Sequence, residues 1–453
     1  MADALAIGFA GLGVLIVLIA LRMPIAYAMI LVGGIGVTLL NGPAIFMSQL
    51  KTLAYGRFTI YDLSVIPMFV LMGNIATKAR LSQDLFRAAN AWLGWLRGGV
   101  AMAAIAACAG FGSVCGSSLA TASTMGQVAL PELKRYRYSD SLATGTLAAG
   151  GVLGILIPPS VVLIIYAVIV EANIVTMFMA ALIPGLIAVV LFIVTIGVYV
   201  LVRPGSGPAG QLPERAEFIA ATVGMLPVLG IFGLVIGGIY FGLFNPTPAA
   251  AIGVFLVWVY GAVRRTVGFA ELRLALLDTA RMSGMIYLIL LGAEMLKIFM
   301  SRGGVPQAIA EWMVNSGLSP MAVLIILLVV LILLGCLMDS LSMILLTIPF
   351  FWPVLVEING GAFVSPADAG FVMSSEDLKI WFGILALIVV ELGLITPPVG
   401  MNVFVISTLA KDVPMRETFR GVAPFFAAEI VRVAVLLAFP MITLWLPRFL
   451  AGP

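Results

Sequence analysis

Two proline pairs interrupt apolar segments at matching places in the two halves of the chain. The first lies in GILIPPS, from Gly154 to Ser160, and the second lies in GLITPPVG, from Gly393 to Gly400. In a lipid bilayer an unpaired backbone N–H or C=O group costs several kcal/mol, so irregular backbone persists at membrane depth only where it is buried or lines a cavity. Paired interruptions of this kind are typical of the binding site of a secondary transporter.

The composition indicates that these segments lie in a membrane. Of the 453 residues, 62% are hydrophobic and 10% are charged, whereas about 25% of the residues in a soluble domain are charged. We therefore expect an all-α polytopic membrane protein. The net charge of +3, with scattered basic residues, does not indicate a nucleic-acid partner. Cys108, Cys115 and Cys336 have no CxxC spacing and are expected to be small buried residues.

About ten segments reach the length of a membrane-spanning helix, which needs roughly 20 apolar residues. The first has neither a basic n-region nor a cleavage site, so we expect a membrane helix rather than a removable signal. Two further stretches, 98–130 and 320–356, carry small polar residues in the middle and are predicted to form re-entrant hairpins. The predicted spans are 5–21, 25–40, 63–77, 141–170, 176–202, 218–241, 247–263, 283–300, 380–409 and 421–446.

The two halves of the chain repeat the same order of features at nearly constant separations. We predict two repeats, 1–202 and 218–453, joined by a cytoplasmic linker at 203–217 that acts as a spacer. Each repeat is expected to hold scaffold helices, an amphipathic arm, a hairpin and a broken helix, the last at 141–170 and 380–409. The arms are predicted around Ser82–Leu96 and Phe269–Asp278, and the matched pairs are Pro24 with Pro248, Gly73 with Gly292, Gly112 with Gly335, and Pro158 with Pro397.

The charges beside the hairpins predict that the repeats are inverted, because short cytoplasmic loops are rich in Lys and Arg. Basic residues flank the first hairpin, which is therefore expected to enter from the cytoplasm. The segment 357–378 after the second hairpin has acidic residues and no Lys or Arg, which indicates the outer side. Both chain ends are then expected outside. Lys51 and Arg57 are exceptions to the rule, because this topology does not place these two basic residues on the cytoplasmic side. The flanking residues are Lys78, Arg80, Arg87, Arg97, Lys134, Arg135 and Arg137.

Hydroxyl groups and irregular backbone offer hard oxygen ligands in both halves, which suits a cation such as sodium. In the first half, carbonyl groups freed near Gly154 would join the hydroxyl groups of the hairpin, including Thr121. The second half repeats the pattern with an added acid, so we predict two cation sites that are not equivalent. The candidate sodium ligands are Ser113, Ser117, Ser118, Gly154, Asp339, Ser342, Gly393 and Thr396.

Three acidic residues in apolar segments need an explanation. Asp339 would cost roughly 2.5 to 3.5 kcal/mol at the bilayer centre, which predicts a cation ligand or a helix N-cap. Glu391, close to the second proline pair, could support a ligand or carry a proton. Glu429 and Arg432 have the i,i+3 spacing of a structural ion pair.

Helices that begin after Pro159 and Pro398 would direct their positive ends toward an anionic substrate. Hydroxyl residues also occur at close helix packing in membranes, and a proline can merely kink a helix. Because four such features form two matched pairs, we favour a binding site. The candidate substrate-binding residues are Gly116, Pro159, Ser160, Ser340, Pro398 and Asn402.

Five stretches resemble the large membrane subunit of tripartite ATP-independent periplasmic (TRAP) transporters, in order and over essentially the whole chain. They are GSSLATASTMG, LPELKRY, GVLGILIPPSVVLIIYA, MDSLSMILLTIPF and ELGLITPPVGMNVFVI. The resemblance implies an elevator-type secondary transporter of the ion transporter superfamily in the bacterial inner membrane. It implies sodium as the coupling ion and a periplasmic binding protein that delivers an organic acid. It also implies a small four-helix membrane subunit, which we expect to be a separate chain.

By the same resemblance, the cation ligands correspond to Ser113, Ser117, Ser118 and Gly154 in one half and to Asp339, Ser342 and Thr396 in the other. The substrate stays open among dicarboxylates, sialic acids, keto acids and other small acids, because the binding protein would make much of the selection.

Three other functions compete with this interpretation. A stand-alone sodium- or proton-coupled dicarboxylate or anion transporter would have the same broad architecture and need no binding protein. A membrane enzyme is disfavoured, because the chain has no histidine, no paired carboxylates and no nucleophile motif. A non-catalytic scaffold would leave the paired breaks and Asp339 without a role.

Overall fold

The computed structural model describes residues 2–451, and within this range the chain is helical with no strand. By length and composition, six of the described helices could cross a membrane, and one bent helix pair makes a seventh. This supports a multi-pass membrane protein. The six helices are α10 (Ile174–Val202), α11 (Arg215–Tyr240), α12 (Pro246–Val263), α13 (Phe269–Gly303), α16 (Ser340–Asn359) and α19 (Met415–Ala438).

Three of the ten predicted spans correspond to shorter helices. The predicted spans 5–21 and 25–40 are the apolar helices α1 (Ala2–Ala20) and α2 (Ile25–Asn41). The predicted span 63–77 is α4 (Val65–Lys78), a helix of 14 residues that follows the 3₁₀ turn η1 (Tyr61–Ser64). The sequence prediction therefore located these segments but overestimated how many reach full spanning length.

Both predicted hairpins are pairs of packed helices separated by a short turn. The first consists of α6 (Gly99–Cys115) and α7 (Ser118–Arg135), and the second consists of α15 (Pro320–Gly335) and α16. Helix α7 continues five residues beyond the predicted boundary at 130, and α16 continues past 356. The three cysteines are free and buried, as expected.

The second helix of each hairpin begins at a side-chain N-cap. The Ser117 hydroxyl oxygen accepts a hydrogen bond from the backbone N–H of Ala120 at 3.4 Å. The carboxylate of Asp339 accepts one from the N–H of Ser342 at 3.1 Å. Such caps satisfy backbone donors that the first helical turn leaves free. The predicted N-cap role of Asp339 is therefore confirmed.

Both proline pairs interrupt a helix, as predicted. The first separates α8 (Asp140–Leu156) from α9 (Val161–Val170), and the two helix axes differ by 45°. The second separates α17 (Ser375–Gly393) from α18 (Met401–Leu409). A proline has no N–H group and its ring clashes with the preceding helical turn, so two in succession end the helix locally. The bonds Pro158–Pro159 and Pro397–Pro398 are both cis.

Only one of the two predicted arms is a separate helix. Helix α5 (Leu81–Leu93) forms the first arm, with an apolar buried face. The second predicted arm is wrong as a separate element, because Phe269–Asp278 forms the first turns of the 35-residue helix α13. No proline interrupts this segment, and its charged residue Asp278, predicted to lie on the arm, pairs with Arg281 on the helix surface at 3.8 Å. The prediction also missed α3 (Pro43–Phe58), α14 (Val305–Asn315) and α20 (Met441–Ala451).

The linker between the halves does more than join them. Its residues 206–210, which we call the strap, form hydrogen bonds with the first half. The N–H groups of Gly98 and Ser139 donate to the carbonyl groups of Gly207 and Ser206, both at 2.9 Å. The N–H of Gly210 donates to the carbonyl of Gly94 at 2.9 Å, and the Tyr138 hydroxyl donates to the Pro208 carbonyl at 3.0 Å. The strap therefore connects the end of α5, the start of α6 and the turn between α7 and α8.

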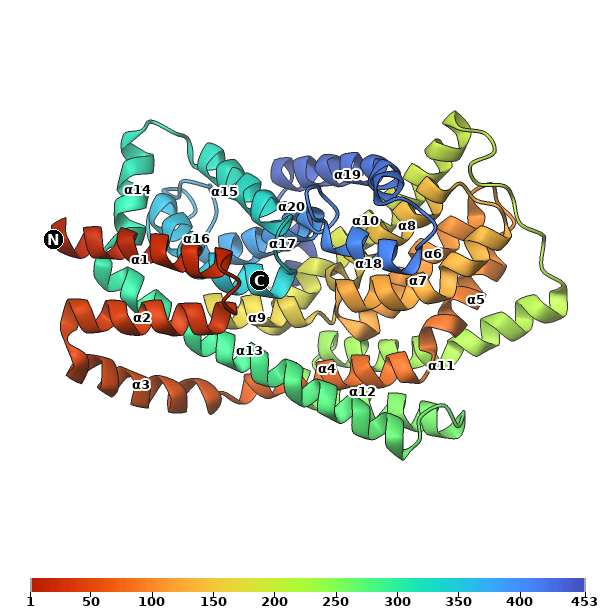
Figure 1. The fold of residues 1–453 in the computed structure, drawn as a ribbon, viewed down its shortest axis with the longest axis horizontal. Helices are drawn as coiled ribbons and strands as arrows, with labels where there is room; N and C mark the ends of the chain where they lie inside the picture. The colour runs from red at the N-terminus through yellow and green to blue at the C-terminus, as the bar shows by residue number, and fades with distance from the viewer. Residues whose placement is uncertain (1, 452–453) are drawn as a thin grey trace.

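Two sets of helices meet where α4 contacts α6 and α13 contacts α16. Helices α1, α2 and α3 lie at one end of the molecule, with α5, α6 and α7 at the other, and α13 runs along the lower side between them (Figure 1). Helix α13 packs on α2 and α4, and α4 also packs on α12. We call the four helices α2, α4, α12 and α13 the scaffold, and the hairpins with the broken helices, α6–α9 and α15–α18, the core unit.

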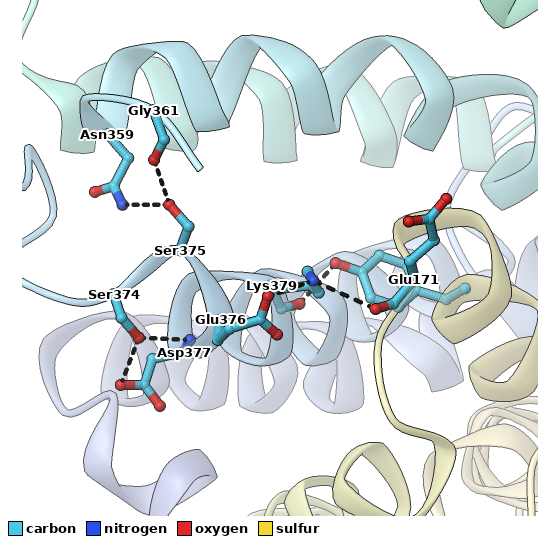
Figure 2. A network of polar contacts seen from close by, with 9 residues as sticks. Glu171, Asn359, Gly361, Ser374, Ser375, Glu376, Asp377 and Lys379 are labelled. Atoms are coloured by element: carbon cyan, nitrogen blue, oxygen red, sulfur yellow. Dashed lines mark hydrogen bonds and ion pairs between the residues drawn. The ribbon is translucent and has the colours of Figure 1, made fainter. Parts of the chain in front are cut away.

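Polar contacts connect the core unit internally. Figure 2 shows Lys379, near the start of α17, donating to the Glu376 carboxylate at 2.7 Å and to the carbonyl of Glu171 after α9 at 3.4 Å. The Tyr166 hydroxyl on α9 donates to the carbonyl of Lys379 at 2.7 Å. Elsewhere, Lys134 at the end of α7 donates to both carboxylate oxygens of Asp412, the longer bond measuring 2.7 Å. These contacts join elements from the two halves into one packed body.

Candidate functional site

A cavity of 380 Å³ lies between the tips of the two hairpins and the scaffold helices α4 and α13. Six residues that the sequence selected line it, although they come from segments far apart in the chain. Three belong to the first hairpin tip and three to the second. They are Gly116, Ser117, Ser118, Asp339, Ser340 and Ser342.

Four helices begin at this cavity. The first residues of α7, α9, α16 and α18 all line it, namely Ser118, Val161, Ser340 and Met401. The first N–H groups of a helix lack intrahelical partners and carry a positive partial charge, which makes a helix N-terminus suitable for binding an anion. The cavity therefore combines four such ends with serine hydroxyl groups.

The other four candidate substrate residues do not line this cavity. Ser160 is buried and caps α9, where its hydroxyl oxygen accepts from the N–H of Leu163 at 3.3 Å. The Asn402 amide nitrogen donates to the carbonyl of Ala148 at 3.4 Å, and its amide oxygen is buried without a hydrogen-bond partner among the described residues. Pro159 is buried next to Gly116, whereas Pro398 is exposed. These four residues lie at the interruptions of the two broken helices and form no part of the cavity wall.

Around Gly154, the first hairpin and the first broken helix touch backbone to backbone. A Cβ atom on Gly112 would lie 2.5 Å from the Cα of Gly154. A Cβ on Gly154 would lie 2.4 Å from Thr121 Oγ1 and 2.7 Å from the carbonyl oxygen of Ser117. Thr121 Oγ1 is buried and has no hydrogen-bond partner among the described residues. Several oxygen atoms thus converge on Gly154, and one of them is available as a ligand. Ser113 instead donates to the carbonyl of Gly110 at 2.7 Å.

The second half repeats this close contact with different side chains. A Cβ atom on Gly393 would lie 2.6 Å from the Cα of Gly335 and 2.9 Å from the carbonyl oxygen of Ile332. The hydroxyl of Thr396 donates to the carbonyl of Leu392 at 2.6 Å. The three atoms nearest a Cβ on Gly393 belong to the backbone of Gly335 and Ile332 rather than to a threonine side chain, and the acid Asp339 lies at the second hairpin tip. The two oxygen clusters therefore differ in composition.

Glu391 lies between the two hairpin tips. It is fully buried, and Ser340 donates a hydrogen bond to its Oε1 atom. Ser118 is also within interaction range of the carboxyl group, while Oε2 has no hydrogen-bond partner among the described residues. A buried carboxyl group with an unused oxygen is expensive unless a proton or a cation accompanies it. Glu391 therefore contacts serine residues of both hairpin tips without lining the cavity, and its role as a supporting group or a proton carrier stays a prediction.

The predicted ion pair between Glu429 and Arg432 is confirmed, and both side chains are fully buried. Arg432 donates to Glu429 through Nε at 3.0 Å and to the carbonyl of Pro184 on α10 at 2.9 Å. This arrangement connects α19 with α10 and leaves the guanidinium group occupied. The pair is therefore part of a structural contact between α19 and α10.

The sequence prediction missed the scaffold side of the cavity. Val70, Gly73 and Asn74 on α4 line it, together with Met282, Met285 and Ile286 on α13. A Cβ on Gly73 would lie 2.8 Å from the carbonyl oxygen of Cys115, so α4 approaches the first hairpin tip closely. The only signal in the sequence was the pairing of Gly73 with Gly292, and it gave no indication of a cavity.

Comparison with known proteins connects this geometry to a family. The family model described as "Tripartite ATP-independent periplasmic transporter, DctM component" matches residues 12–442. The chain is 33% identical over 391 residues to the C4-dicarboxylate TRAP transporter large permease protein DctM of Pseudomonas aeruginosa, covering 86% of this chain and 87% of that protein. It is 28% identical over 434 residues to the sialic acid TRAP transporter large permease protein SiaM of Vibrio cholerae, covering 95% and 96%.

A solved structure shares the fold at low sequence identity. The YdaH transporter of Alcanivorax borkumensis superimposes with a TM-score of 0.59 at 14% identity, and the match covers 88% of each chain. At this identity the likeness concerns the fold alone. The overall helical fold is therefore one that a solved transporter also adopts.

Proposed function

Because this chain belongs to the DctM-component family of TRAP transporters, we propose that it is the large permease subunit of a sodium-coupled system that imports an organic acid. Its partners in this proposal are a small four-helix membrane subunit and a periplasmic binding protein that delivers the acid. The proposed location is the bacterial inner membrane, crossed several times. Relatives of the chain are named for different acids, a C4-dicarboxylate and sialic acid.

The convergence of four helix N-termini on one cavity is the observation that carries the proposal. Each N-terminus stabilises a nearby anion by about 0.3 to 1 kcal/mol when exposed and by up to about 2 kcal/mol when partly buried. The end of α16 already carries the carboxylate of Asp339 as its cap, so the ends of α7, α9 and α18 are the ones that offer a carboxylate a binding site without a basic side chain. The hydroxyl of Ser117, which lines the cavity and only accepts a bond from the N–H of Ala120, keeps its own proton as a donor at the same place.

Sodium is the cation we propose for the two oxygen clusters. Carbonyl and hydroxyl oxygens are hard ligands, and those around Gly154 include the buried, unpartnered hydroxyl of Thr121. Ser113, Ser117, Ser118 and Gly154 remain the proposed first ligand set, to which we add Thr121. Asp339, Ser342, Gly393 and Thr396 remain the second. A membrane potential supplies about 2.3 kcal/mol per charge per 100 mV, so cotransported sodium would drive uptake.

We also propose that the halves form an inverted repeat and that the core unit moves as an elevator past the scaffold. The backbone contact of Gly112 with Gly154 has a counterpart in that of Gly335 with Gly393, between corresponding elements of each half. The polar contact of Lys134 with Asp412 holds the core unit together internally. Toward it, α4 and α13 present mostly apolar side chains at the cavity, and an apolar surface offers few directional contacts that would oppose sliding.

Reconstitution into liposomes tests this function. The chain, its small subunit and its binding protein should take up labelled acid when sodium is higher outside, and removing either the gradient or the binding protein should abolish uptake. Uptake at the same rate without the binding protein would refute the tripartite mechanism and favour a stand-alone transporter. A rate that does not depend on the sodium gradient would refute sodium coupling.

A further inference from the structure

The cavity between the hairpin tips and the scaffold has two chemically different walls. The hairpin tips supply helix N-termini and the hydroxyl groups of serine residues. The scaffold supplies Val70 from α4 and Met282, Met285 and Ile286 from α13. From this contrast we infer that the permease itself selects a monocarboxylic acid with an apolar body over a dicarboxylic acid. The inference rests on the proposed transport function and specifies its substrate class.

The polar wall has room for one carboxylate. Asp339 is the one charged side chain among the described residues that line the cavity, and its charge is negative. A second carboxylate would meet no Lys or Arg among the described lining residues, and Asp339 would repel it wherever sodium does not offset that charge, because like charges at short range disfavour one another. The ends of α7, α9 and α18, which have no carboxylate cap, line the same cavity, so they would share a single anionic group.

The scaffold wall disfavours a second charged group. Among its residues, Asn74 has the one side-chain amide, and one of its two N–H groups donates to the hydroxyl of Thr279 at 2.9 Å, which leaves at most one for a ligand. A carboxylate pressed against methionine and isoleucine side chains would lose water without gaining a hydrogen bond, which is strongly unfavourable. A hydrocarbon group in the same place is favoured, since burying apolar area contributes about 25 cal/mol per Å².

The shape of the wall suits an aliphatic or branched body. Methionine is unbranched and polarizable, and it adapts to apolar groups of different outline. Met282 and Met285 lie one turn apart on α13 and keep more than a third of their surface exposed, at 38% and 49%. The cavity volume of 380 Å³ is within the usual range for small-molecule sites. A branched-chain 2-oxo acid such as 4-methyl-2-oxopentanoate has these properties.

A binding measurement on the permease alone tests this selection separately from the binding protein. The purified complex of this chain and its small subunit is titrated with 4-methyl-2-oxopentanoate or with succinate in the presence of sodium, and thermal stabilisation is followed. We expect the monocarboxylate to bind at least tenfold more tightly. Equal or tighter binding of succinate would overturn the inference and leave the proposed function intact. Failure of every carboxylate tested to stabilise the complex in sodium would overturn both.

A substitution pair locates the selectivity in the scaffold wall. Met285→Arg adds a cation to the apolar wall and should improve succinate binding relative to the monocarboxylate by at least tenfold. Met47→Arg is the matched control, since Met47 lies on α3, is exposed and does not line the cavity, so the preference should stay unchanged. An unchanged preference in Met285→Arg, with Met47→Arg behaving as expected, would show that the α13 wall does not select the substrate.

Discussion

The hydroxyl group of Ser340 donates a hydrogen bond to the carboxylate of Glu391, and this contact joins the tip of the second hairpin to the second broken helix. Both side chains are buried, at 3% and 0% exposure. Ser118, at the first hairpin tip, is also within interaction range of the same carboxyl group. One side chain therefore contacts parts of the site from both halves, and changes at Glu391 should affect both.

Replacing Glu391 with Ala should lower the thermal stability of the purified complex more than replacing it with Gln. The alanine variant leaves the Ser340 hydroxyl without its acceptor, and a buried group left unsatisfied costs about 1 to 3 kcal/mol. The glutamine variant keeps an acceptor of similar shape. Thermal unfolding of the purified complex measures the difference. Equal losses of stability in the two variants would show that the hydrogen bond to Ser340 contributes nothing measurable.

Replacing Asp339 with Asn should separate its two roles. Asparagine is as good an N-cap as aspartate, so the unfolding temperature should change little. If the carboxylate holds sodium, removing its charge should raise the half-saturating sodium concentration for uptake at least tenfold. Asp339→Ala, which removes both the cap and the charge, should lower stability as well. An unchanged sodium dependence in Asp339→Asn would exclude this residue as a ligand.

Replacing Gly154 with Ala should reduce uptake at least tenfold. The added methyl group would lie 2.4 Å from Thr121 Oγ1 and 2.7 Å from the Ser117 carbonyl oxygen, and overpacking of this kind costs about 1 to 3 kcal/mol. Gly393→Ala should act similarly, since its methyl group would lie 2.6 Å from the Cα of Gly335. Gly230→Ala on α11 is the control, because nothing lies within 4 Å of its Cβ position. Wild-type uptake by Gly154→Ala would show that the close contact is dispensable.

The contact between Lys134 and Asp412 should respond to acid. The Lys134 ammonium group lowers the pKa of the Asp412 carboxyl below its usual value through a hydrogen bond. A depressed pKa contributes stability that is present above the usual value and is lost as the pH falls through the lowered one. Asp412→Asn should therefore be slightly less stable than the wild type at neutral pH.

This difference should shrink at pH values below about 4, where an ordinary aspartate is protonated. The effect should be small, since exposed ion pairs contribute little. The matched control is Asp278→Asn, which removes an exposed pair within a single helix and should change stability less. A stability difference that is the same at neutral and acidic pH would contradict this account of the contact.

Features with a local cause could be predicted from the sequence. Proline pairs end helices because of their own covalent structure, so both breaks were located correctly. Asp339 caps α16 because a short side chain with an oxygen acceptor, placed just before a helix, can accept a hydrogen bond from a free N–H group of the first turn. The ion pair of Glu429 with Arg432 follows from helical spacing alone. The family membership rests on motifs in the same local stretches.

Features that depend on tertiary contact could not be predicted. The predicted arm 269–278 continues into the following span as the single helix α13, and its mixture of charged and apolar residues does not reveal this continuity. Asn74 and Met285 have no distinguishing sequence context and reach the cavity only through the packing of α4 and α13. Ser160 and Asn402 have polar groups that could bind a substrate, yet in the folded protein both form hydrogen bonds with backbone groups, those of Leu163 and Ala148.

The strap belongs structurally to the first half of the protein, so the boundary between the two halves lies after the strap rather than at the end of α10. The N–H groups of Gly98 and Ser139 find their acceptors on Gly207 and Ser206, beyond the last helix of the first half. A polypeptide that stops at Val202 would lack those acceptors, whereas one that continues to Leu212 would contain the whole strap. A version of the protein assembled from two separate fragments should therefore be divided on the C-terminal side of the strap, just before α11.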